Sequence, residues 1–598
     1  MDQEKNLAQM FKNRVAKYGD KPYLRQKKDG RWAAYSYKDV DRRATDIALG
    51  LLALGCKRGD RVSLLAENRP EWAMVDLATQ CLGGILATIY ATNTPEQCAY
   101  IVNNSESRFV VVSNNNQLHK LLGRGVSLPL VEKIVIFDPI DGITDKDPRV
   151  LTLAKVEELG RGYERPEELE RAIAATTFDD VATLIYTSGT TGDPKGVMLT
   201  HGNFYTNVHA IQTITPVTDN ETFLSFLPLS HSLERTAGHW IPMFIGATVN
   251  FAESIDALRQ NLQEIKPTTM VSVPRIYEKF HAAITDNIAK SSPIKQKLFD
   301  WALAVGKQVG ALKRDSKAVP YLLQVQYDLA DKLVFSKIKA NLGGNLRFAV
   351  SGGAPLAAEL FEFFFALGLP IYEGYGLTET TPIVTCNTPA AVRMGTVGKV
   401  IPGVTVKIAD DGEILVKGPN VMKGYYKAPD ATAEAIVDGW FHTGDIGELD
   451  ADGFLRITDR KKDLIVTAGG KNVAPQNIEN MLKMDRYIEQ VNVIGDRRRY
   501  LTAIVVPNLA EVEKWAQAKG LKHAEPPDLV KLPEVKQLLQ ESIEKVNRQL
   551  AKYETIKKFH LTHVVFSQEN DMLTPTLKVK RKKVNAFFAQ EIEAMYEE

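Results

Sequence analysis

The chain has 598 residues, of which 44% are hydrophobic and 25% are charged, so it should fold into two or more domains, and a long disordered chain is excluded. Its 74 Lys and Arg residues balance 73 Asp and Glu residues, so the overall charge gives no argument for a nucleic-acid partner. The four scattered cysteines exclude a disulfide framework and favour a reducing, cytoplasmic location.

The first region, from about residue 37 to 137, alternates helical patterns with short β-branched runs. Strands are expected at 61–65, 86–90, 109–113 and 133–137, and a helix is expected to begin at Pro70. This alternation predicts α/β layers with mostly parallel strands. The uncharged stretch 77–95 contains polar residues and two glycines, which indicates a buried helix and strand and not a membrane span.

The middle and the end of the chain have different patterns. Residues 291–342 lack strand signals and predict a helical excursion inside the large domain. Residues 412–417 and 453–458 predict antiparallel strands next to Asp-Gly turns. The charged segment 459–463 then divides the chain, so we expect a large domain over 1–460 and a small, mobile α+β domain over 461–598. The large domain should combine layered α/β subdomains, with mostly parallel sheets, and a β-rich subdomain.

The segment Tyr186–His201 is the most informative part of the sequence. It contains three glycines, interleaved hydroxyl residues and Lys195, a composition that suits a loop that cradles phosphate groups. It is neither a Walker A loop nor a hydrolase nucleophile elbow, because both spacings fail.

This loop resembles the phosphate-binding signature of the adenylate-forming (AMP-binding) superfamily, and further motifs of that superfamily follow in the same order. They are LPLSH at 227–231, SGGAP at 351–355, YEGYGLTE at 372–379, WFHTGD at 440–445, Asp459-Arg460 and TPTLK at 574–578. The resemblance covers the chain from about Tyr37 to its C-terminus.

The resemblance implies an ATP site, a Mg2+ ligand and a catalytic lysine. Implied catalytic residues are Lys578, Glu379, Thr187 and His231, with Glu379 also holding the metal. The implied ATP and AMP ligands are Thr187, Ser188, Gly189, Thr190, Thr191, Gly192, Lys195, Gly352, Gly353, Ala354, Glu373, Gly374, Tyr375, Gly376, Thr378, Asp445 and Arg460. Within this set, Tyr375 would face adenine and Asp445 would face the ribose hydroxyls. Outside it, the resemblance implies a hinge at Lys462 and a coenzyme A path bordered by Gly469 and Gly470.

Several segments resemble the long-chain fatty acyl-CoA synthetase branch, among them 230–235, 273–279, 551–557 and the helical excursion. The expected reaction joins a fatty acid to coenzyme A with ATP and Mg2+, through an acyl-adenylate. Arg235 stands where one bacterial subtype has a tryptophan gate, and Trp240 is out of register with it. The apolar run 361–370 would line an alkyl tunnel or belong to the core.

Alternatives remain open at this point. They are an acyl-adenylate ligase, an acyl–carrier-protein synthetase, a medium-chain or aryl acid ligase, and a silent fatty-acid carrier. Only 20 residues follow Lys578, which disfavours a peptide-synthetase module. The basic run 580–583 is interpreted as a solvated patch that could dock on the inner face of a membrane or lie near the 3′-phosphate of coenzyme A. The oligomeric state is left open.

Overall fold

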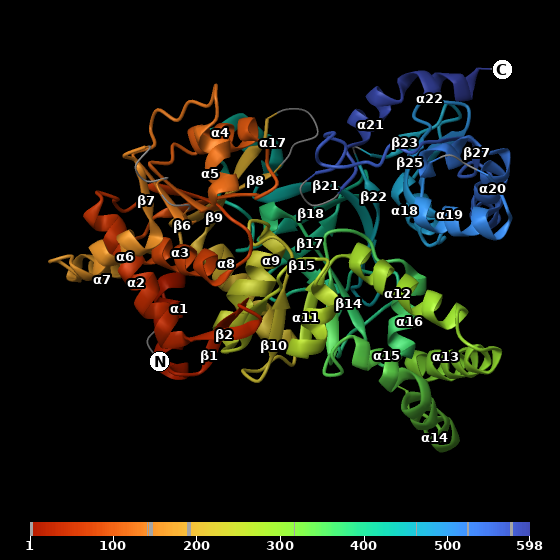
Figure 1. Ribbon diagram of the computed structural model, residues 1–598, viewed down its shortest axis with the longest axis horizontal. Helices are drawn as coiled ribbons and strands as arrows, with labels where there is room; N and C mark the ends of the chain where they lie inside the picture. The colour runs from red at the N-terminus through yellow and green to blue at the C-terminus, as the bar shows by residue number, and fades with distance from the viewer. Residues whose placement is uncertain are drawn as a thin grey trace.

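The computed structural model describes residues 4–139, 142, 147–187, 193–315, 317–461, 463–522, 525–574 and 578–597 (Figure 1). The chain forms two large sheets, a five-stranded antiparallel sheet and a small C-terminal unit, and the strands of the first three alternate in part along the sequence. This mixed α/β architecture confirms the predicted fold class. In the described ranges, no helix is both long and apolar enough to cross a bilayer.

The first large sheet has eight strands, and the six from β8 to the edge strand β7 run parallel. In spatial order the strands are β19 (Gly424–Tyr425), β9 (Lys195–Thr200), β8 (Val181–Thr187), β4 (Ile85–Ile89), β3 (Arg61–Leu65), β5 (Phe109–Asn114), β6 (Lys133–Asp138) and β7 (Val150–Thr152). The helices between them are α2 (Tyr37–Ala53), α3 (Pro70–Cys81), α4 (Pro95–Asn104), α5 (Asn115–Leu122), α6 (Leu153–Arg161), α7 (Glu167–Ala175) and α8 (His201–Ile214). The strand expected at 61–65 and the helix start at Pro70 are confirmed.

The second large sheet has nine strands, with parallel pairing from β14 through β1. Its order is β16 (Lys399–Val400), β15 (Ile383–Cys386), β14 (Ile371–Gly376), β13 (Phe348–Ser351), β12 (Thr269–Ser272), β10 (Thr222–Ser225), β11 (Thr248–Phe251), β1 (Pro22–Lys28) and β2 (Arg31–Ser36). The N-terminal strands β1 and β2 thus extend a sheet whose other members lie about two hundred residues or more further along the chain. The preceding helix α1 (Leu7–Tyr18) packs on α2 and α3.

Helices cover the second sheet and form the predicted excursion. They are α9 (Ser232–Glu234), the π-helix η1 (Arg235–Trp240), α10 (Ile241–Ile245), α11 (Leu258–Ile265), α12 (Pro274–Ala289), α13 (Pro293–Arg314), α14 (Tyr321–Ala330), η2 (Asp331–Phe335), α15 (Ser336–Asn341) and α16 (Ala358–Ala366). The helical excursion is confirmed. Phe361, Phe363 and Phe364 on α16 are buried in the core between these helices, which favours core over tunnel for the run 361–370.

A five-stranded antiparallel sheet carries Asp445 and Arg460 on two paired strands. It contains β17 (Thr405–Ile408), β18 (Glu413–Lys417), β20 (Ile436–Val437), β21 (Trp440–Leu449) and β22 (Leu455–Arg460), with α17 (Pro429–Ala435) preceding β20. Strands expected at 412–417 and 453–458 are present as β18 and β22, each paired with β21.

The C-terminal part carries its own small sheets and core. Its elements are β23 (Ile465–Val466), β24 (Asn472–Val473), α18 (Pro475–Lys483), β25 (Ile488–Ile494), β26 (Leu501–Pro507), α19 (Leu509–Ala518), η4 (Pro526–Lys531), α20 (Pro533–Asn547), β27 (Ile556–Leu561), α21 (Arg581–Phe587) and α22 (Ala589–Tyr596). An ion pair between Arg275 on α12 and Glu489 on β25 links this part to the rest of the molecule, and both side chains are about one-third exposed.

Candidate functional site

The phosphate-loop segment is a hairpin between β8 and β9. Thr187 ends β8 and lies opposite Lys195, which begins β9 with an exposed side chain. Two residues of the predicted loop therefore stand side by side at its base. The other five lie outside the described residues: Ser188, Gly189, Thr190, Thr191 and Gly192.

Asp445 lies at the centre of the predicted ribose site. The Tyr375 hydroxyl donates to its Oδ2 at 2.7 Å, and Arg460 Nε donates to its Oδ1 at 3.2 Å. Asp445 is buried, and burial raises its pKa even though the Arg460 charge lowers it. A carboxylate has about four acceptor positions, so each oxygen of Asp445 can accept one more hydrogen bond. Two acceptors side by side suit the vicinal hydroxyls of a ribose.

The loop 352–356 forms the neighbouring wall and is held by Glu373 on β14. The Leu356 N–H donates to Glu373 Oε1 at 3.0 Å, and burial raises the pKa of Glu373 to about 8. Glu373 is therefore a neutral acid at pH 7. Gly353 has a φ of +81° and is exposed, as is Ala354, so both can border a ligand.

The three other predicted glycines of this region have different surroundings. A Cβ on Gly376 would lie 1.6 Å from the Pro382 carbonyl oxygen. The close approach of the backbone at Pro382 to Gly376 therefore requires a glycine here. A Cβ on Gly374 would meet the Thr385 carbonyl at 3.4 Å, and one on Gly352 would meet the Leu233 side chain at 3.3 Å. We had expected Gly374 and Gly376 to allow close approach of a ligand, whereas the contacts of Gly376 lie within the protein.

Glu379, the expected magnesium ligand, is held by a tyrosine that no motif had indicated. The Tyr425 hydroxyl donates to Glu379 Oε1 at 2.9 Å, and Lys195 Nζ lies 5.3 Å from the centre of the Tyr425 ring. Thr378 contacts Ser232 through their hydroxyls at 3.2 Å, which ties this motif to the loop of His231.

The expected Mg2+ site at Glu379 offers few protein ligands. Among the described residues, no three His, Cys, Asp or Glu side chains gather as a metal cage. Mg2+ is usually held by one or two carboxylates together with phosphates and water, and the single carboxylate of Glu379 fits that mode of binding.

Lys578 comes from the C-terminal part and lies among these charges. Its side chain is exposed, yet desolvation in the crowded cleft and the charge of Arg460 lower its pKa, while Asp445 and Glu379 oppose that shift. Desolvation, helped by Lys578, lowers the pKa of His231 to about 4. His231 is thus neutral, and its Nδ1 accepts the Leu233 N–H at 3.2 Å. The Lys578 side chain is thus accessible to solvent and within electrostatic range of Asp445 and Glu379.

The predicted coenzyme A residues are not brought into this cluster. Lys462 lies outside the described residues. Gly469 and Gly470 occupy an exposed turn between β23 and β24, next to Ala468, whose N–H bonds to the Arg498 carbonyl of the same small unit.

Arg235, at the position of the expected gate, belongs to a closed ionic cluster. It is fully buried, and its guanidinium donates to both oxygens of Asp76, at 3.0 and 2.6 Å. It also donates to the Thr183 hydroxyl on β8, the strand that leads into the phosphate loop. Trp240, the residue out of register, is completely buried as well.

The basic run 580–583 is a solvated patch only in part. Lys582 and Lys583 are exposed. Arg581 instead donates to both oxygens of the buried Glu479, at 2.6 and 2.7 Å. Lys580 and Lys583 both pair with Asp571, so much of the positive charge of the run is neutralised within the protein.

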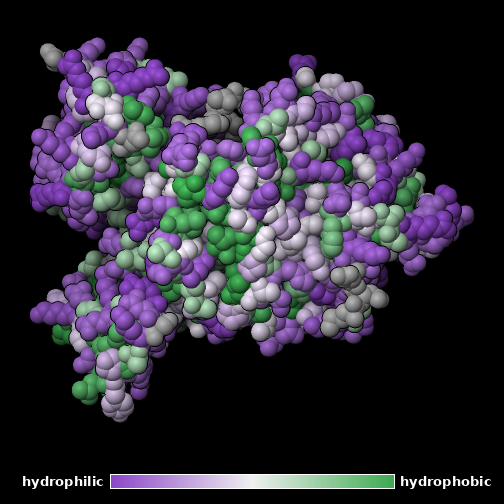
Figure 2. Space-filling view, turned by 180° about the vertical axis from the view of Figure 1, so that it is seen from behind, coloured by the Kyte–Doolittle hydropathy of each residue, from purple (hydrophilic) through white to green (hydrophobic). Residues whose placement is uncertain are grey.

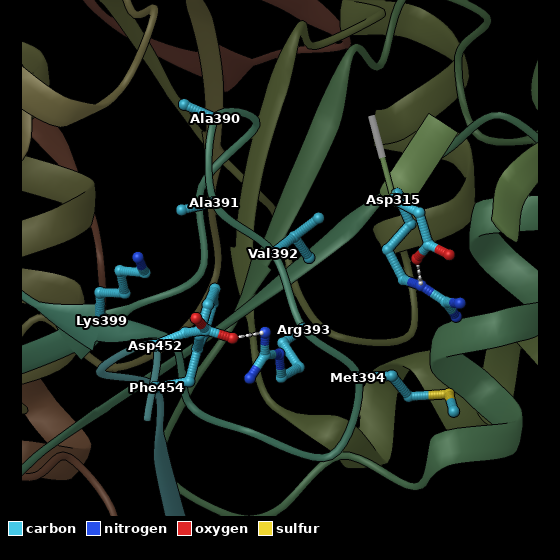
Figure 3. A pocket seen from close by; sticks show the side chains of 10 residues that line it. Asp315, Ala390, Ala391, Val392, Arg393, Met394, Lys399, Asp452 and Phe454 are labelled. Atoms are coloured by element: carbon cyan, nitrogen blue, oxygen red, sulfur yellow. Dashed lines mark hydrogen bonds and ion pairs between the residues drawn. The ribbon is translucent and has the colours of Figure 1, made fainter. Parts of the chain in front are cut away.

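A cavity of about 630 Å³ lies away from the motifs, between the end of α13 and the residues before β16 (Figure 3). Most of its charged groups form ion pairs: Arg393 with Asp452 and with the nearby Asp450, and Arg314 with Asp315. None of the residues that line it belongs to the predicted site set.

Comparisons with known proteins agree with the order of the motifs. Residues 11–426 match the family model of AMP-binding enzymes, and residues 462–598 match the model of the AMP-binding enzyme C-terminal domain. The chain is 38% identical to long-chain-fatty-acid–CoA ligase FadD15 of Mycobacterium bovis, over 95% of this chain and 93% of that protein. It is 34% identical to long-chain-fatty-acid–CoA ligase ACSBG2 of Xenopus laevis, over 99% of this chain and 84% of that protein.

Solved structures show the same fold at lower identity. The adenylation domain of a carboxylate reductase from Mycobacterium chelonae aligns with a TM-score of 0.77 at 24% identity, covering 99% of this chain and 91% of that one. The anthranilate CoA ligase AuaEII, solved with anthranoyl-AMP, aligns with a TM-score of 0.73 at 20% identity, covering 99% of both chains. From the family models and the relatives together, the chain belongs to the AMP-binding enzymes, in the family of acyl-CoA ligases.

Proposed function

We propose that the protein is an ATP-dependent long-chain fatty acid–CoA ligase, which converts a fatty acid, ATP and coenzyme A into acyl-CoA, AMP and pyrophosphate. Support for the long-chain substrate comes from the relatives named above, both called long-chain ligases. The observation that carries the proposal is the arrangement at Asp445, whose carboxylate accepts hydrogen bonds from Tyr375 and Arg460 and interacts with the charge of Lys578.

In the first step, a carboxylate oxygen of the fatty acid bonds to the α-phosphorus of ATP, and the bond from that phosphorus to the pyrophosphate oxygen breaks. Two anions meet in this step, and Lys578 reduces their repulsion and stabilises the charge that develops. Thr187, Lys195 and the loop between them hold the outer phosphates. Mg2+, when bound to Glu379, supplies further neutralisation of the phosphate charge.

The other site residues position the nucleotide and the acid. Asp445 and Arg460 hold the ribose, Tyr375 faces the adenine and the loop kept in place by Glu373 forms the opposite wall. His231, neutral at pH 7, lines the entry of the acyl carboxylate next to Lys578. Its uncharged ring leaves the attacking carboxylate free of a competing ion pair.

In the second step, the small domain, 461–598, turns about Lys462 and withdraws Lys578. Gly469 and Gly470, which carry no bulky side chain, then border the path of the pantetheine arm. The thiol sulfur bonds to the acyl carbon, the bond to AMP breaks, and the thiol proton passes to solvent. The product is free acyl-CoA.

An initial-rate panel of acids from acetate to oleate, with ATP and coenzyme A, tests this function. We expect the highest kcat/KM for long acyl chains, and pyrophosphate and acyl-CoA in equal amounts. Highest activity on short or aryl acids would contradict the long-chain assignment. Acyl-adenylate as the end product with coenzyme A present would indicate an adenylate-only ligase, and absence of ATP–pyrophosphate exchange would indicate a silent carrier.

A further inference from the structure

Helix α14 and the turn η2 carry a stripe of exposed apolar side chains, called here the α14 stripe. Its members are Tyr321, Leu322, Val325, Leu329 and Leu333, and Tyr321 and Leu322 are 81% and 75% exposed. Helical spacing places them on one face over about 18 Å. Exposed apolar side chains that gather on one helix face can mark an interaction site.

The opposite face of the same segment is an ordinary core face. Tyr327, Ala330, Val334, Phe335 and Ile338 are buried with α13 and α16. The helix is therefore fixed to the protein by one face and presents the other outward. It stands at the lower edge of the molecule in Figure 1, and hydrophobic residues are visible on the lower-left projection in Figure 2.

The helical excursion that carries the stripe has an excess of basic residues, of which Lys307, Arg314, Lys317 and Lys339 pair with carboxylates. Residues 290–341 contain ten Lys and Arg residues and four Asp and Glu residues, in a chain whose overall net charge is +1. Lys332 lies within the stripe and Lys337 at its edge, both exposed, and Asp328 is the acidic residue at the other edge. An apolar face with lysines beside it complements an anionic lipid surface, since the apolar groups enter the interface while lysines extend to the headgroups.

We propose that the α14 stripe docks the protein on anionic membranes. The inference deepens the proposed function, on which it rests, because long-chain fatty acids partition into bilayers and a docked ligase meets them there. The run 580–583 is less suited to this role, since Arg581 is occupied by Glu479, and Lys580 and Lys583 share Asp571.

Vesicle flotation of the full chain tests the proposal, using phosphatidylcholine vesicles with 30 mol% phosphatidylglycerol and no fatty acid, ATP or coenzyme A. Leu322→Gln with Leu329→Gln should weaken the partition coefficient at least tenfold, because two interfacial apolar side chains are lost. The matched control is Leu130→Gln with Ile255→Gln, two side chains of 50% and 48% exposure outside the stripe, which should leave binding unchanged.

A second pair of variants tests the charge. Lys332→Gln with Lys337→Gln should weaken binding about thirtyfold, at about fivefold per lysine, and the loss should shrink at high salt. Lys582→Gln with Lys583→Gln, on α21, should have little effect. Circular dichroism of each variant checks that the substituted helices stay folded.

Several results would overturn the proposal. They are failure of the unmodified protein to float with anionic vesicles, equal binding by the stripe variant and its control, and loss of binding only with the α21 variant. A concentration-dependent dimer that the stripe variant abolishes, without vesicle binding, would assign the surface to a second copy instead. Vesicle binding without long-chain ligase activity would refute the proposed function and leave the docking surface standing.

Discussion

The molecule contains two clusters of buried charge that the chain uses in opposite ways. The Arg235 guanidinium donates to both oxygens of Asp76. Burial alone would raise the pKa of Asp76, but the charge of Arg235 lowers this pKa to about 2. At Asp445 the effect of burial on the pKa exceeds the effect of the neighbouring cation. Burial raises the pKa of that carboxylate, and each of its oxygens accepts only one hydrogen bond from Tyr375 or Arg460.

The difference separates a charge cluster that stabilises the fold from one that binds a ligand. A buried ion pair whose hydrogen bonds are made by other protein groups fixes the relative position of the elements it joins, here α3, η1 and β8. A cluster with spare acceptors and a partly desolvated lysine keeps charge that a ligand can complement. Substitutions should therefore affect stability in the first cluster and turnover in the second.

Arg235→Ala should give the largest effect, a loss of about 3–5 kcal/mol in the free energy of unfolding, because Asp76 would remain buried without its cation. Urea unfolding followed by tryptophan fluorescence measures it. The paired replacement Arg235→Met with Asp76→Leu should recover most of the loss. A single variant within 1 kcal/mol of the unmodified protein would show that the cluster does not stabilise the fold.

This cluster also marks the limit of what the sequence could predict. The strand 61–65 and the helix beginning at Pro70 were predictable, because hydrophobic period and helix-start signals are local. The partner of Arg235 lies 159 residues away, and no local pattern indicates it. From the sequence, Arg235 indicated only that the tryptophan gate of one bacterial subtype is absent at this position, and not that the residue forms a buried ion pair.

The candidate site was predictable where residues stand in ordered motifs and not where contacts cross the chain. Asp445, Tyr375 and Glu379 stand in such motifs, whereas Tyr425 reaches Glu379 only because β19 pairs with β9. A glycine before two tyrosines was the only signal for Tyr425. The role of Gly376 likewise depends on Pro382, which the fold brings against it.

Lys578→Ala should lower ATP–pyrophosphate exchange about a hundredfold or more, the usual cost of losing one electrostatic group at a transition state. The thermal midpoint should stay the same, since Lys578 belongs to the binding cluster. Thioester formation from supplied acyl-adenylate should be largely retained. Equal losses in both half-reactions would contradict the assigned role.

Glu234, the sequence neighbour of Arg235, is a buried carboxyl without a cation. Burial raises its pKa to about 8, although a hydrogen bond from the Ser225 hydroxyl at 2.6 Å acts to lower that pKa. Its folded pKa exceeds its unfolded value, so the protonated group contributes stability in full below about pH 4.5. That contribution is lost as the pH rises to about 8, by up to about 1.4 kcal/mol per pH unit.

Glu234→Gln should remove this pH dependence, because the amide resembles the neutral acid and cannot ionise. Urea unfolding of both proteins from pH 5 to 8 measures the difference in slope. We expect the unmodified protein to lose stability more steeply over this range. Parallel curves would show that Glu234 is ionised in the folded protein or that its site is hydrated.

Tyr425→Phe should have the smallest effect, about a fivefold rise in the Mg2+ concentration that gives half-maximal exchange, since one hydrogen bond to Glu379 is lost. Binding of Mn2+ with ATP, followed by electron paramagnetic resonance, gives a readout besides activity. Tyr426→Phe is the matched control, because the neighbouring hydroxyl bonds to Glu106 at 2.9 Å instead. Identical metal dependence in the two variants would remove Tyr425 from the metal site.

The ion pair between Arg275 and Glu489 has a thermodynamic consequence for the whole catalytic cycle. Because both side chains are about one-third exposed, the pair is worth about 1 kcal/mol or less and is screened by dissolved ions. Breaking it therefore opposes a rotation of the small domain only weakly. If the small domain turns as proposed, ionic strength would be an adjustable control on how long Lys578 stays beside Asp445, and the two half-reactions should respond to salt in opposite directions.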